Sequence, residues 1–351
     1  AGYTGRAQSD SVKVIPVETY GLLVEDAVQR RVMDTMVTEL TQQLADMEQI
    51  QAIAFGITRP AAYRGLICGE PYVAGPAGRI LDKEGKVVLD KGIHQMGRAE
   101  VVRAMAASIQ SGGSTEEGGL MLDLSRNLVE PEGLIHRKNV QRSGITDTIA
   151  SAYGKNAYDW QTPWSVIPTI HFFMGGAVAD ENGRTKVPGL FAAGEVMGGV
   201  HGANRLGSVA LTEMLVFGLR AGKAAAETAG QADSGISRDE GKRISGLLHR
   251  QGKERPFHLM QKLQGLMWQA VGLERSREGL LAAMEEVKQL KELADQTYIG
   301  SEQIYNTNLR DAVELQFMLE TAMLVTASAL YREESRGAHL RSDFPSHGGT
   351  E

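Results

Sequence analysis

One stretch of the chain, residues 187–227, combines the residue types that an electron-rich ligand needs. A turn and a short apolar run, Leu190–Ala193, predict a buried strand that ends at Gly194 and Glu195. A glycine-rich loop follows, and from about Arg205 the apolar residues recur at helical spacing. A helix that begins after such a loop presents backbone N–H groups, and small residues allow a ligand to approach closely. The stretch therefore predicts a ligand-binding turn, although similar turns occur in many α/β proteins without a ligand.

Three motifs are more specific than this pattern. The stretch contains HGANRLG, the segment before it reads HFFMGG from His171 to Gly176, and the C-terminus carries RGAHLRSDFP. Together they resemble the flavoprotein subunits of the succinate dehydrogenase and fumarate reductase family, which also includes L-aspartate oxidase. The resemblance covers roughly residues 45–345 and implies an FAD-dependent oxidoreductase.

The resemblance implies roles for particular residues. His171 and Arg205 would hold the carboxylates of a small-molecule substrate, a task that suits the forked guanidinium group. Glu195 would place its carboxylate on a flavin hydroxyl, and the start of the following helix would point at the flavin ring. The residues expected to bind the cofactor are Gly175, Gly176, Gly194, Glu195, Asn204, Gly207, Ser208, Ala210 and Leu211.

At three other positions the sequence lacks the residue that members of the family carry. Ile53, Cys68 and Ala74 stand where relatives carry a histidine, a threonine and the arginine that shuttles the proton. Alanine cannot transfer a proton, and redox chemistry beside a carboxylate needs a donor or acceptor. Arg64 and Arg79 are the candidate replacements, and Arg79 is taken as the third catalytic residue. No segment matches the family's flavin-linking histidine, so covalent flavin is unsupported.

Composition agrees with a soluble enzyme of two or three domains. The net charge of -6 over 351 residues argues against a nucleic-acid binder, and no apolar run reaches membrane-spanning length. The single cysteine, Cys68, excludes an intrachain disulfide and a Cys₄ cluster, and we expect no metal site. Cys68 is interpreted as a buried filler, with a redox thiol near the flavin as the alternative. Any iron–sulfur centres must belong to a partner chain.

The resemblance implies an α/β fold, with which the order of the predicted elements agrees. It would comprise a partial Rossmann-like FAD-binding domain, an inserted α+β capping domain and a C-terminal helical domain. The predicted ranges are 1–51 for a poorly readable remnant of the FAD-binding domain, 52–165 for the substrate-capping domain, 166–230 for the second part of the FAD-binding domain, and 231–351 for the helical domain and tail.

Periodicity and turn signals predict the local elements of the cap and the last third. The cap should contain a hairpin turn at residues 82–85, a helix over 97–109, a strand within 118–124, and a loop over 153–168 with two packing tryptophans. Four helices are expected afterwards, over residues 237–250, 259–271, 275–293 and 309–331. In the tail, Arg336, His339 and Arg341 are expected to tie the chain down.

The dinucleotide fingerprint is missing. No G-x-G-x-x-G follows a predicted strand, and in relatives that turn holds the ADP half of FAD. We therefore expect a further dinucleotide-binding segment, in the same chain or in a tightly bound partner, without which FAD is not retained.

Two functions remain open. The first is a dicarboxylate oxidoreductase that reduces fumarate or oxidises succinate and exchanges electrons with an iron–sulfur subunit. The second is a flavin electron-transfer subunit of a larger redox complex, with a remodelled site. His171 and Arg205 favour the first function, whereas Ile53, Cys68 and Ala74 favour the second; a non-catalytic scaffold is the third reading. The resemblance implies a cytoplasmic protein, held peripherally at the inner membrane where its partner subunits are anchored.

Overall fold

The computed structural model describes residues 43–345 apart from residues 91, 229–243 and 303. The chain divides into two compact units. Among the described residues, the first unit comprises residues 50–173, and the second comprises residues 43–49 and 174–345. The predicted remnant of the FAD-binding domain, up to residue 42, lies outside the described residues.

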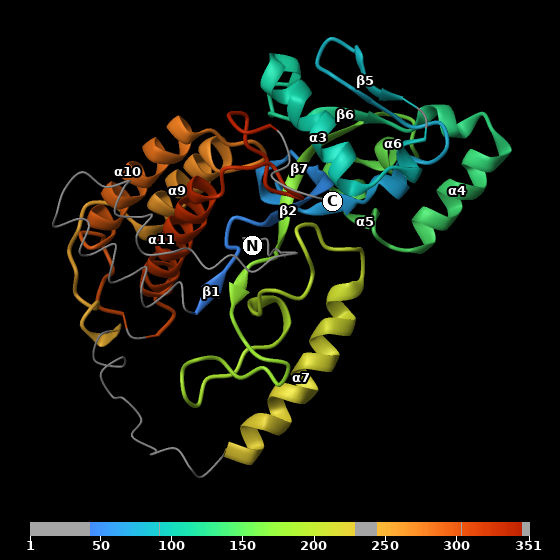
Figure 1. The fold of residues 1–351 in the computed structure, drawn as a ribbon. Coiled ribbons are helices and arrows are strands. Elements are labelled where there is room, and N and C mark those ends of the chain that lie inside the picture. The colour runs from blue at the N-terminus through green and yellow to red at the C-terminus, as the bar shows by residue number, and fades with distance from the viewer. Residues whose placement is uncertain (1–42, 91, 229–243, 303, 346–351) are drawn as a thin grey trace. The chain divides into compact units, whose positions relative to one another are not determined.

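The first unit is built on a six-stranded antiparallel sheet with the order β3-β2-β7-β6-β4-β5. Its strands are β2 (Ile50–Ile57), β3 (Ile67–Gly69), β4 (Arg79–Leu81), β5 (Val87–Asp90), β6 (Leu120–Asp123) and β7 (Trp164–Phe173). Strand β2 is buried along its whole length, as its nearly continuous apolar sequence indicates. Helix α3 (Arg98–Ser108) packs against β2 and β7 (Figure 1). The predicted hairpin, the helix and the strand before residue 124 are all present.

The pairing of β2 with β7 is interrupted by β-bulges. Gln51 lies opposite Phe172 and Ala52 lies opposite Ile170, so His171 is the extra residue on β7. A bulge redirects the side chain that it carries and is typical of strands beside functional sites. His171 therefore has no directly opposite partner on β2, unlike its neighbours Ile170 and Phe172.

Short helices complete the first unit. They are α4 (Pro131–Arg142), α5 (Asp147–Tyr153), α6 (Lys155–Tyr158), the 3₁₀ helices η1 (Ala61–Tyr63), η2 (Pro71–Ala74), η3 (Ile93–Gln95) and η5 (Ser125–Leu128), and the π-helix η4 (Ile109–Gly113). The loop predicted over residues 153–168 is wrong, because α6 and the first half of β7 lie there. Trp160 and Trp164 are fully buried, as expected of packing residues, and the Trp164 indole donates to the Ala157 carbonyl at 2.7 Å.

The second unit contains the glycine-rich motifs. A two-stranded ladder joins β1 (Leu44–Ala45) to β8 (Gly176–Ala177), and the 3₁₀ helix η6 (Gly194–Val196) precedes α7 (Val209–Thr228). The predicted strand at residues 190–193 is reduced to one bridge between Phe191 and Arg184. Helix α7 begins four residues later than predicted, because Ser208 has a φ of +66° and a left-handed residue cannot continue a right-handed helix.

Three long helices pack together near the C-terminus (Figure 1). They are α9 (Pro256–Ala270), α10 (Arg277–Ala294) and α11 (Thr307–Tyr331). Side chains of Ser276 and Asn306 cap the N-termini of α10 and α11, at 3.2 and 2.8 Å from the amides of Gly279 and Leu309. Their shared core comprises Leu259, Leu263, Val287, Leu290, Ala294, Leu315, Leu319 and Ala322. Each leucine buried there stabilises the fold by about 1.5–3 kcal/mol.

Three of the four predicted late helices are therefore confirmed. Of the fourth, predicted over residues 237–250, residues 237–243 lie outside the described residues. Residues 244–245 are helical, and residues 246–249 form turns. Helix α11 is long and apolar enough to cross a membrane by length and composition, but half of that window is buried against other parts of the protein. A core helix has the same properties, so α11 is explained by its packing on α9 and α10.

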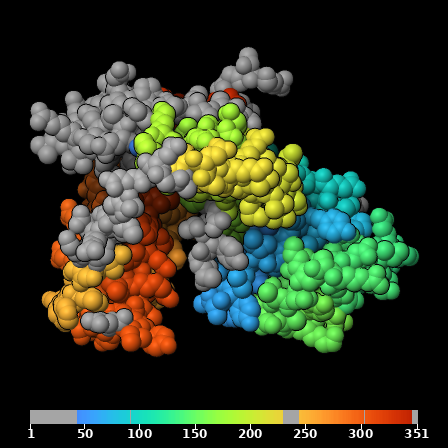
Figure 2. Space-filling model, turned by 90° about the horizontal axis from the view of Figure 1, so that it is seen from below, coloured from blue at the N-terminus to red at the C-terminus, as the bar shows by residue number. Residues whose placement is uncertain are grey.

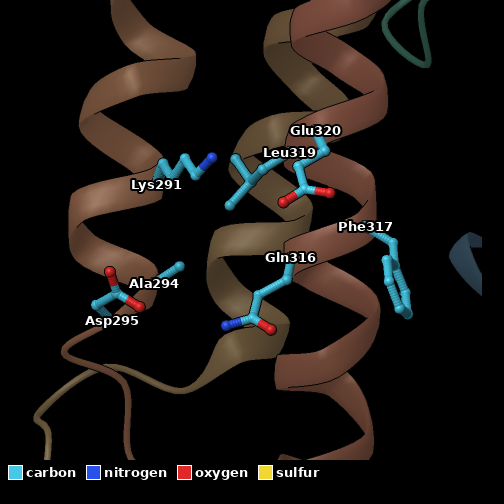
Figure 3. Close-up of a pocket in the computed structure, with 7 residues that line it drawn as sticks. All are labelled: Lys291, Ala294, Asp295, Gln316, Phe317, Leu319 and Glu320. Carbon is cyan, nitrogen blue, oxygen red and sulfur yellow. The ribbon is translucent and has the colours of Figure 1, made fainter. Parts of the chain in front are cut away.

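A groove of about 350 Å³ lies between α10 and α11 (Figure 3). Its lining is mostly polar and comprises Lys291, Ala294, Asp295, Gln316, Phe317, Leu319 and Glu320. None of these residues belongs to the three motifs, so the groove is separate from the residues considered below.

A buried ion-pair network ties the segment before β2 to the C-terminal end of α11. Arg332 donates to Asp46 at 2.6 Å, to Glu48 at 2.5 Å and to Glu334 at 2.8 Å. Burial disfavours its charge, yet the three carboxylates hold the pKa of Arg332 above its ordinary value. Removing one partner of such a buried pair costs about 3–5 kcal/mol. The network therefore fixes residues 46–48 within the second unit.

Candidate functional site

The end of the HFFMGG motif and the HGANRLG motif are in direct contact within the second unit. The backbone amide of Arg205 donates to the sulfur of Met174 at 3.1 Å. The two glycines after Met174 leave no room for a side chain. A Cβ on Gly175 would lie 2.2 Å from the Asp46 carbonyl oxygen, and one on Gly176 would lie 2.2 Å from that of Val196. Gly175 is thus packed against the backbone at Asp46, and Gly176 against the backbone of η6.

The Gly194-Glu195 turn is fixed by a residue that sequence reasoning missed. The amide of Gly194 donates to Oε1 of Glu213 at 3.0 Å. Burial raises the pKa of the Glu213 carboxyl above its ordinary value, against the opposing effect of the Gly194 hydrogen bond. The signal was present in the sequence, since Glu213 is the one acidic residue of an otherwise apolar run, ALTEMLVFGL. A buried carboxyl needs such a partner.

His201, the first residue of HGANRLG, lies beside this carboxyl. Its Nε2 atom is 3.8 Å from Oε2 of Glu213. Burial, together with the charge of Arg205, lowers the pKa of His201 to about 4. The imidazole is therefore neutral near pH 7 and forms no ion pair with Glu213 there. Of the two side chains, only that of Arg205 carries a full positive charge near pH 7.

The start of α7 combines backbone donors with exposed apolar side chains. Ser208 turns the chain into the helix, and its carbonyl accepts from the Leu211 amide at 3.2 Å. Leu206 and Leu211 are 75% and 63% exposed, and Figure 2 shows the side chains of α7 (yellow) along the surface. An apolar ring with an electron-rich edge matches this combination, because helix N-termini attract electron density.

The C-terminal tail packs against the same loop. The amide of Ala338 donates to the carbonyl of Ala203 at 2.9 Å. Gly337 has a φ of +58°, and a Cβ there would lie 2.1 Å from the same carbonyl oxygen. The tail motif is therefore a structural support for HGANRLG.

Two tail side chains are completely enclosed. Nδ1 of His339 accepts from Arg275 at 2.5 Å, and its Nε2 donates to the Arg332 carbonyl at 3.2 Å. Burial, and then the charge of Arg275, hold the pKa of His339 well below its ordinary range. Arg341 donates to the Ala329 carbonyl at 2.8 Å and so satisfies the end of α11. These contacts tie the tail down.

His171 lies in the first unit, within a polar network. Its Nε2 atom is 3.2 Å from the side-chain oxygen of Gln51, which is 1% exposed. Arg98 donates to the same oxygen at 2.5 Å and to Glu70 at 2.9 Å. Sequence reasoning missed Gln51, Arg98 and Glu70, because only the pairing of β2 with β7 and the docking of α3 bring them to His171.

The three positions that depart from the family are buried and apolar. Ile53 is 4% exposed, while Cys68 and Ala74 are fully buried. Burial raises the pKa of the Cys68 thiol to about 12, although a backbone hydrogen bond acts in the opposite direction. The thiol donates to the Phe55 carbonyl at 3.4 Å. Cys68 is therefore protonated at neutral pH, which favours the filler interpretation over a redox thiol.

The two candidate replacement arginines have different surroundings. Arg79 is paired with Asp123 through Nε at 2.9 Å and Nη2 at 2.8 Å. Burial disfavours the charge of Asp123, but hydrogen bonds from Ser125 and Arg79 outweigh it and lower the pKa of Asp123. Arg64 is exposed and donates to the carbonyls of Glu117 at 2.9 Å and Thr58 at 3.3 Å. The proton-transfer role of Arg79 stays a prediction.

The predicted site residues thus fall into two groups. The second unit contains Arg205 and every residue expected to bind the cofactor. The first unit holds His171 and Arg79. Among the residues that the structure describes, no three His, Cys, Asp or Glu side chains gather as a metal-binding group.

Comparisons with known proteins agree with these motifs. Residues 32–211 match the family model of the FAD binding domain, and residues 260–349 match that of the fumarate reductase flavoprotein C-terminal region. One subunit of the fumarate reductase (CoM/CoB) of Methanothermobacter marburgensis is 40% identical over 310 residues, which are 86% of this chain and 54% of the relative. A fumarate reductase flavoprotein subunit of Mycobacterium tuberculosis is 42% identical over 194 residues, 51% of this chain and 33% of that protein.

Solved structures give the same result. The Mycobacterium smegmatis Sdh1 complex in the apo form matches with a TM-score of 0.74 at 29% identity, over 88% of this chain and 51% of that one. A quinol-fumarate reductase with menaquinol molecules has a TM-score of 0.74 at 27% identity, over 88% and 56%. The chain spans about half the length of the curated relatives it matches. The predicted fold class and the FAD cofactor are confirmed. The chain belongs to the fumarate reductase and succinate dehydrogenase flavoprotein family of FAD-dependent oxidoreductases.

Proposed function

We propose that this chain forms part of a flavin subunit that passes electrons between a small dicarboxylate-like substrate and an iron–sulfur partner. The observation that carries the proposal is the 3.1 Å hydrogen bond from the Arg205 amide to Met174. This bond holds the backbone of Arg205, the predicted carboxylate-binding residue of the second unit, next to Met174 and therefore close to Gly175 and Gly176. The guanidinium group pairs with planar carboxylates through two parallel hydrogen bonds.

The residues of the second unit fit FAD by the chemistry of their donors. Glu195 would accept from a flavin hydroxyl, and the amides of residues 208–210 at the start of α7 would donate to the electron-rich edge of the ring, since the Leu211 amide already donates to the Ser208 carbonyl. Gly175 and Gly176 keep the backbone beside η6 free of side chains. When bound, FAD supplies hydride transfer to or from the substrate carbon, while the protein supplies position and electrostatics.

Three side chains have separate tasks in substrate handling. Arg205 holds one carboxylate, and its positive charge polarises the neighbouring bond. His201 cannot take this role near pH 7, because its imidazole is neutral there. His171 contributes a second donor to the substrate. Arg79 is retained as the proposed proton donor, since Ala74 cannot act at the family position.

The partner assignments follow from what this chain lacks and from the relatives' names. With one cysteine, the given sequence supplies no Cys₄ cluster, so an iron–sulfur subunit would exchange electrons with the flavin. Beyond that subunit, electrons would be exchanged with either a quinol-type donor or a CoM/CoB-type partner, as named for the two kinds of match. The protein works in the cytoplasm, and where the partners are anchored it is peripheral at the membrane.

The second candidate is a flavin electron-transfer subunit whose substrate site is remodelled. The apolar, buried state of Ile53, Cys68 and Ala74 favours it. These side chains offer no acid, base or carboxylate donor where relatives carry a histidine, a threonine and an arginine.

Reoxidation of the reduced flavin separates the two candidates. The native flavoprotein, with all its segments and partners, is reduced chemically and mixed with fumarate in a stopped-flow instrument. Rapid reoxidation that is lost in Arg205→Gln but kept in Arg220→Gln supports the dicarboxylate function. Arg220 is a suitable control because it lies on α7 and donates to the Glu181 carbonyl, at 3.3 Å. Reoxidation by one-electron acceptors without any response to fumarate would support the remodelled subunit instead.

A further inference from the structure

Gln49, the last residue before β2, carries a fully buried side-chain amide in the second unit. Its exposed fraction is 0%. Neither the side-chain oxygen nor the side-chain nitrogen has a hydrogen-bond partner among the residues that the structure describes. No other side chain in the described part of the chain leaves two buried polar atoms unpaired. Burying an amide without partners is destabilising, and buried polar groups of native proteins are almost always satisfied, so this amide requires a partner.

The backbone of Gln49 is fixed from both sides. Its amide donates to the Asp46 carbonyl at 2.9 Å, and its carbonyl accepts from the Met174 amide at 2.8 Å. The carbonyl of the preceding residue, Glu48, accepts from Arg275 at 2.8 Å. The main chain at residue 49 is therefore paired, and only the side-chain amide is left without a partner. A side chain on such a fixed backbone meets a ligand with little further loss of conformational entropy.

The hydrogen bond to Met174 places the Gln49 side chain beside the motif residues. It extends the antiparallel pairing of Ile50 with Phe173 by one residue, so Gln49 lies opposite Met174. Opposite residues of an antiparallel pair project from the same face, with Cβ atoms about 4.5–5.5 Å apart. The sulfur of Met174 accepts from the Arg205 amide at 3.1 Å. Met174 thus connects the buried amide to the loop that leads into α7.

A primary amide has a specific chemical complement. Its oxygen accepts, its nitrogen donates, and the two atoms lie side by side. A group that pairs with both atoms therefore offers a donor and an acceptor side by side, as a cyclic imide does. The ring system of FAD has one such edge, at N3–H and the two carbonyl groups that flank it. A carboxylate would pair only with the nitrogen of the amide, because it only accepts.

We propose that Gln49 binds the imide edge of the flavin ring. Its side-chain oxygen accepts from N3–H, and its side-chain nitrogen donates to one of the two flanking carbonyl oxygens. The inference rests on the proposed function for the placement of the ring beside the second unit's motifs. It does not depend on the identity of the substrate or of the redox partner.

Two measurements on the native flavoprotein, with all its segments and partners, test the assignment after FAD has been removed reversibly. Gln49→Leu deletes both polar atoms. The FAD-free variant is more stable than FAD-free wild type in urea unfolding, because an unpaired buried amide has been removed. Its dissociation constant for FAD, measured by fluorescence quenching, is about tenfold higher, as expected for the loss of two neutral hydrogen bonds. Gln264→Leu, at an exposed position on α9, leaves both quantities unchanged.

The position on the ring is tested with 3-methyl-FAD, an analogue without the N3–H donor. Wild type binds this analogue less tightly than FAD, and Gln49→Leu loses that preference, which isolates the pairwise interaction as in a double-mutant cycle. The infrared band of the flavin carbonyl groups gives a readout that needs no removal of FAD. It lies at higher wavenumber in FAD-loaded Gln49→Leu than in wild type, because a hydrogen-bond donor is gone. Gln49→Met, an unbranched replacement, takes the place of the leucine variant if that variant does not fold.

Three results overturn the proposal. A less stable FAD-free variant with unchanged FAD affinity means that a protein segment pairs with Gln49. Unchanged FAD affinity together with an unchanged carbonyl band means that internal water satisfies the amide. An equal preference for FAD over 3-methyl-FAD in wild type and variant removes the imide edge as its partner. The proposed function fails separately, when the reduced flavin does not respond to fumarate, because none of these measurements involves the substrate.

Discussion

The amide of Arg205 donates to the sulfur of Met174 across a separation of 31 residues. This hydrogen bond joins the last three residues of HFFMGG to HGANRLG within the second unit. The hydrogen bond to Met174 therefore fixes the backbone from which the Arg205 side chain extends. The first prediction tests what that side chain does.

Replacing Arg205 with glutamine removes the proposed carboxylate anchor. Hydrogen bonds to charged groups contribute about 1.5–3 kcal/mol, so the apparent affinity for fumarate should fall about 10- to 150-fold. Stopped-flow reoxidation at increasing fumarate concentration measures it. Met174→Leu, which keeps the volume but removes the acceptor, should cost less than about 1.5 kcal/mol in stability. An unchanged fumarate dependence in Arg205→Gln would remove Arg205 from the site.

Glu213 should give the protein a specific dependence of stability on pH. Burial raises the pKa of its carboxyl above the ordinary value of 4.5, so between these two values the native state holds a proton that the unfolded state has released. The free energy of unfolding therefore decreases as pH rises through this window, and the loss is complete above the folded-state pKa. Glu213→Gln keeps an acceptor for Gly194 but cannot ionise.

Urea unfolding of wild type and Glu213→Gln at pH 4 and pH 7 checks this sign. The variant should gain stability relative to wild type as the pH is raised. Glu227→Gln is the control, because Glu227 is an exposed carboxylate near the other end of α7. A difference between wild type and Glu213→Gln that does not change with pH would mean that Glu213 is ionised normally in the native state.

The roles of Arg79 can be separated by testing both partners of its ion pair. As a proton donor, Arg79 is expected to affect the rate, and Arg79→Gln should slow fumarate-dependent reoxidation about 10²–10⁴-fold. Asp123→Asn breaks the same ion pair but leaves the guanidinium in place, so it should lower stability and largely preserve the rate. Equal losses of stability with unchanged rates in both variants would leave Arg79 only its structural pairing with Asp123.

The sequence was most informative where structure is local. Helical periodicity located α10 and α11 within two residues of their observed ends. The hairpin between β4 and β5 followed from the turn at Asp82–Gly85, which closes with a hydrogen bond from the Gly85 amide to the Asp82 carbonyl at 3.0 Å. The residues that predict such a helix or hairpin lie within that element itself or within a few residues of it.

The failures depend on contacts between distant segments. The bulge at His171 exists only in the register of β7 against β2, which no local pattern specifies. The bond from Gly194 to Glu213 depends on where α7 begins, and the left-handed Ser208 moved that start to Val209. The motif residues themselves were found by resemblance, while their supports, Gln51, Arg98 and Glu213, required the fold.

The contact between the tail and the HGANRLG loop allows a paired test with two glycines. Gly337 has a φ of +58°, and an added Cβ would lie 2.1 Å from the Ala203 carbonyl oxygen. Gly337→Ala should therefore displace the tail from the loop and lower the free energy of unfolding by at least about 1–3 kcal/mol. Gly265→Ala is the matched control, because Gly265 lies inside α9 and an added Cβ there meets nothing within 4 Å.

In that helical position alanine should instead stabilise the protein by about 0.5–1 kcal/mol. Thermal unfolding of the native flavoprotein gives both numbers, and the fumarate dependence of reoxidation shows whether the loop that carries Arg205 has moved. We expect Gly337→Ala to lower the melting temperature and to raise the fumarate concentration needed for half-maximal reoxidation, because Arg205 follows Ala203 by two residues. If Gly337→Ala melted like wild type and kept its fumarate dependence, the tail would not be the support of the HGANRLG loop.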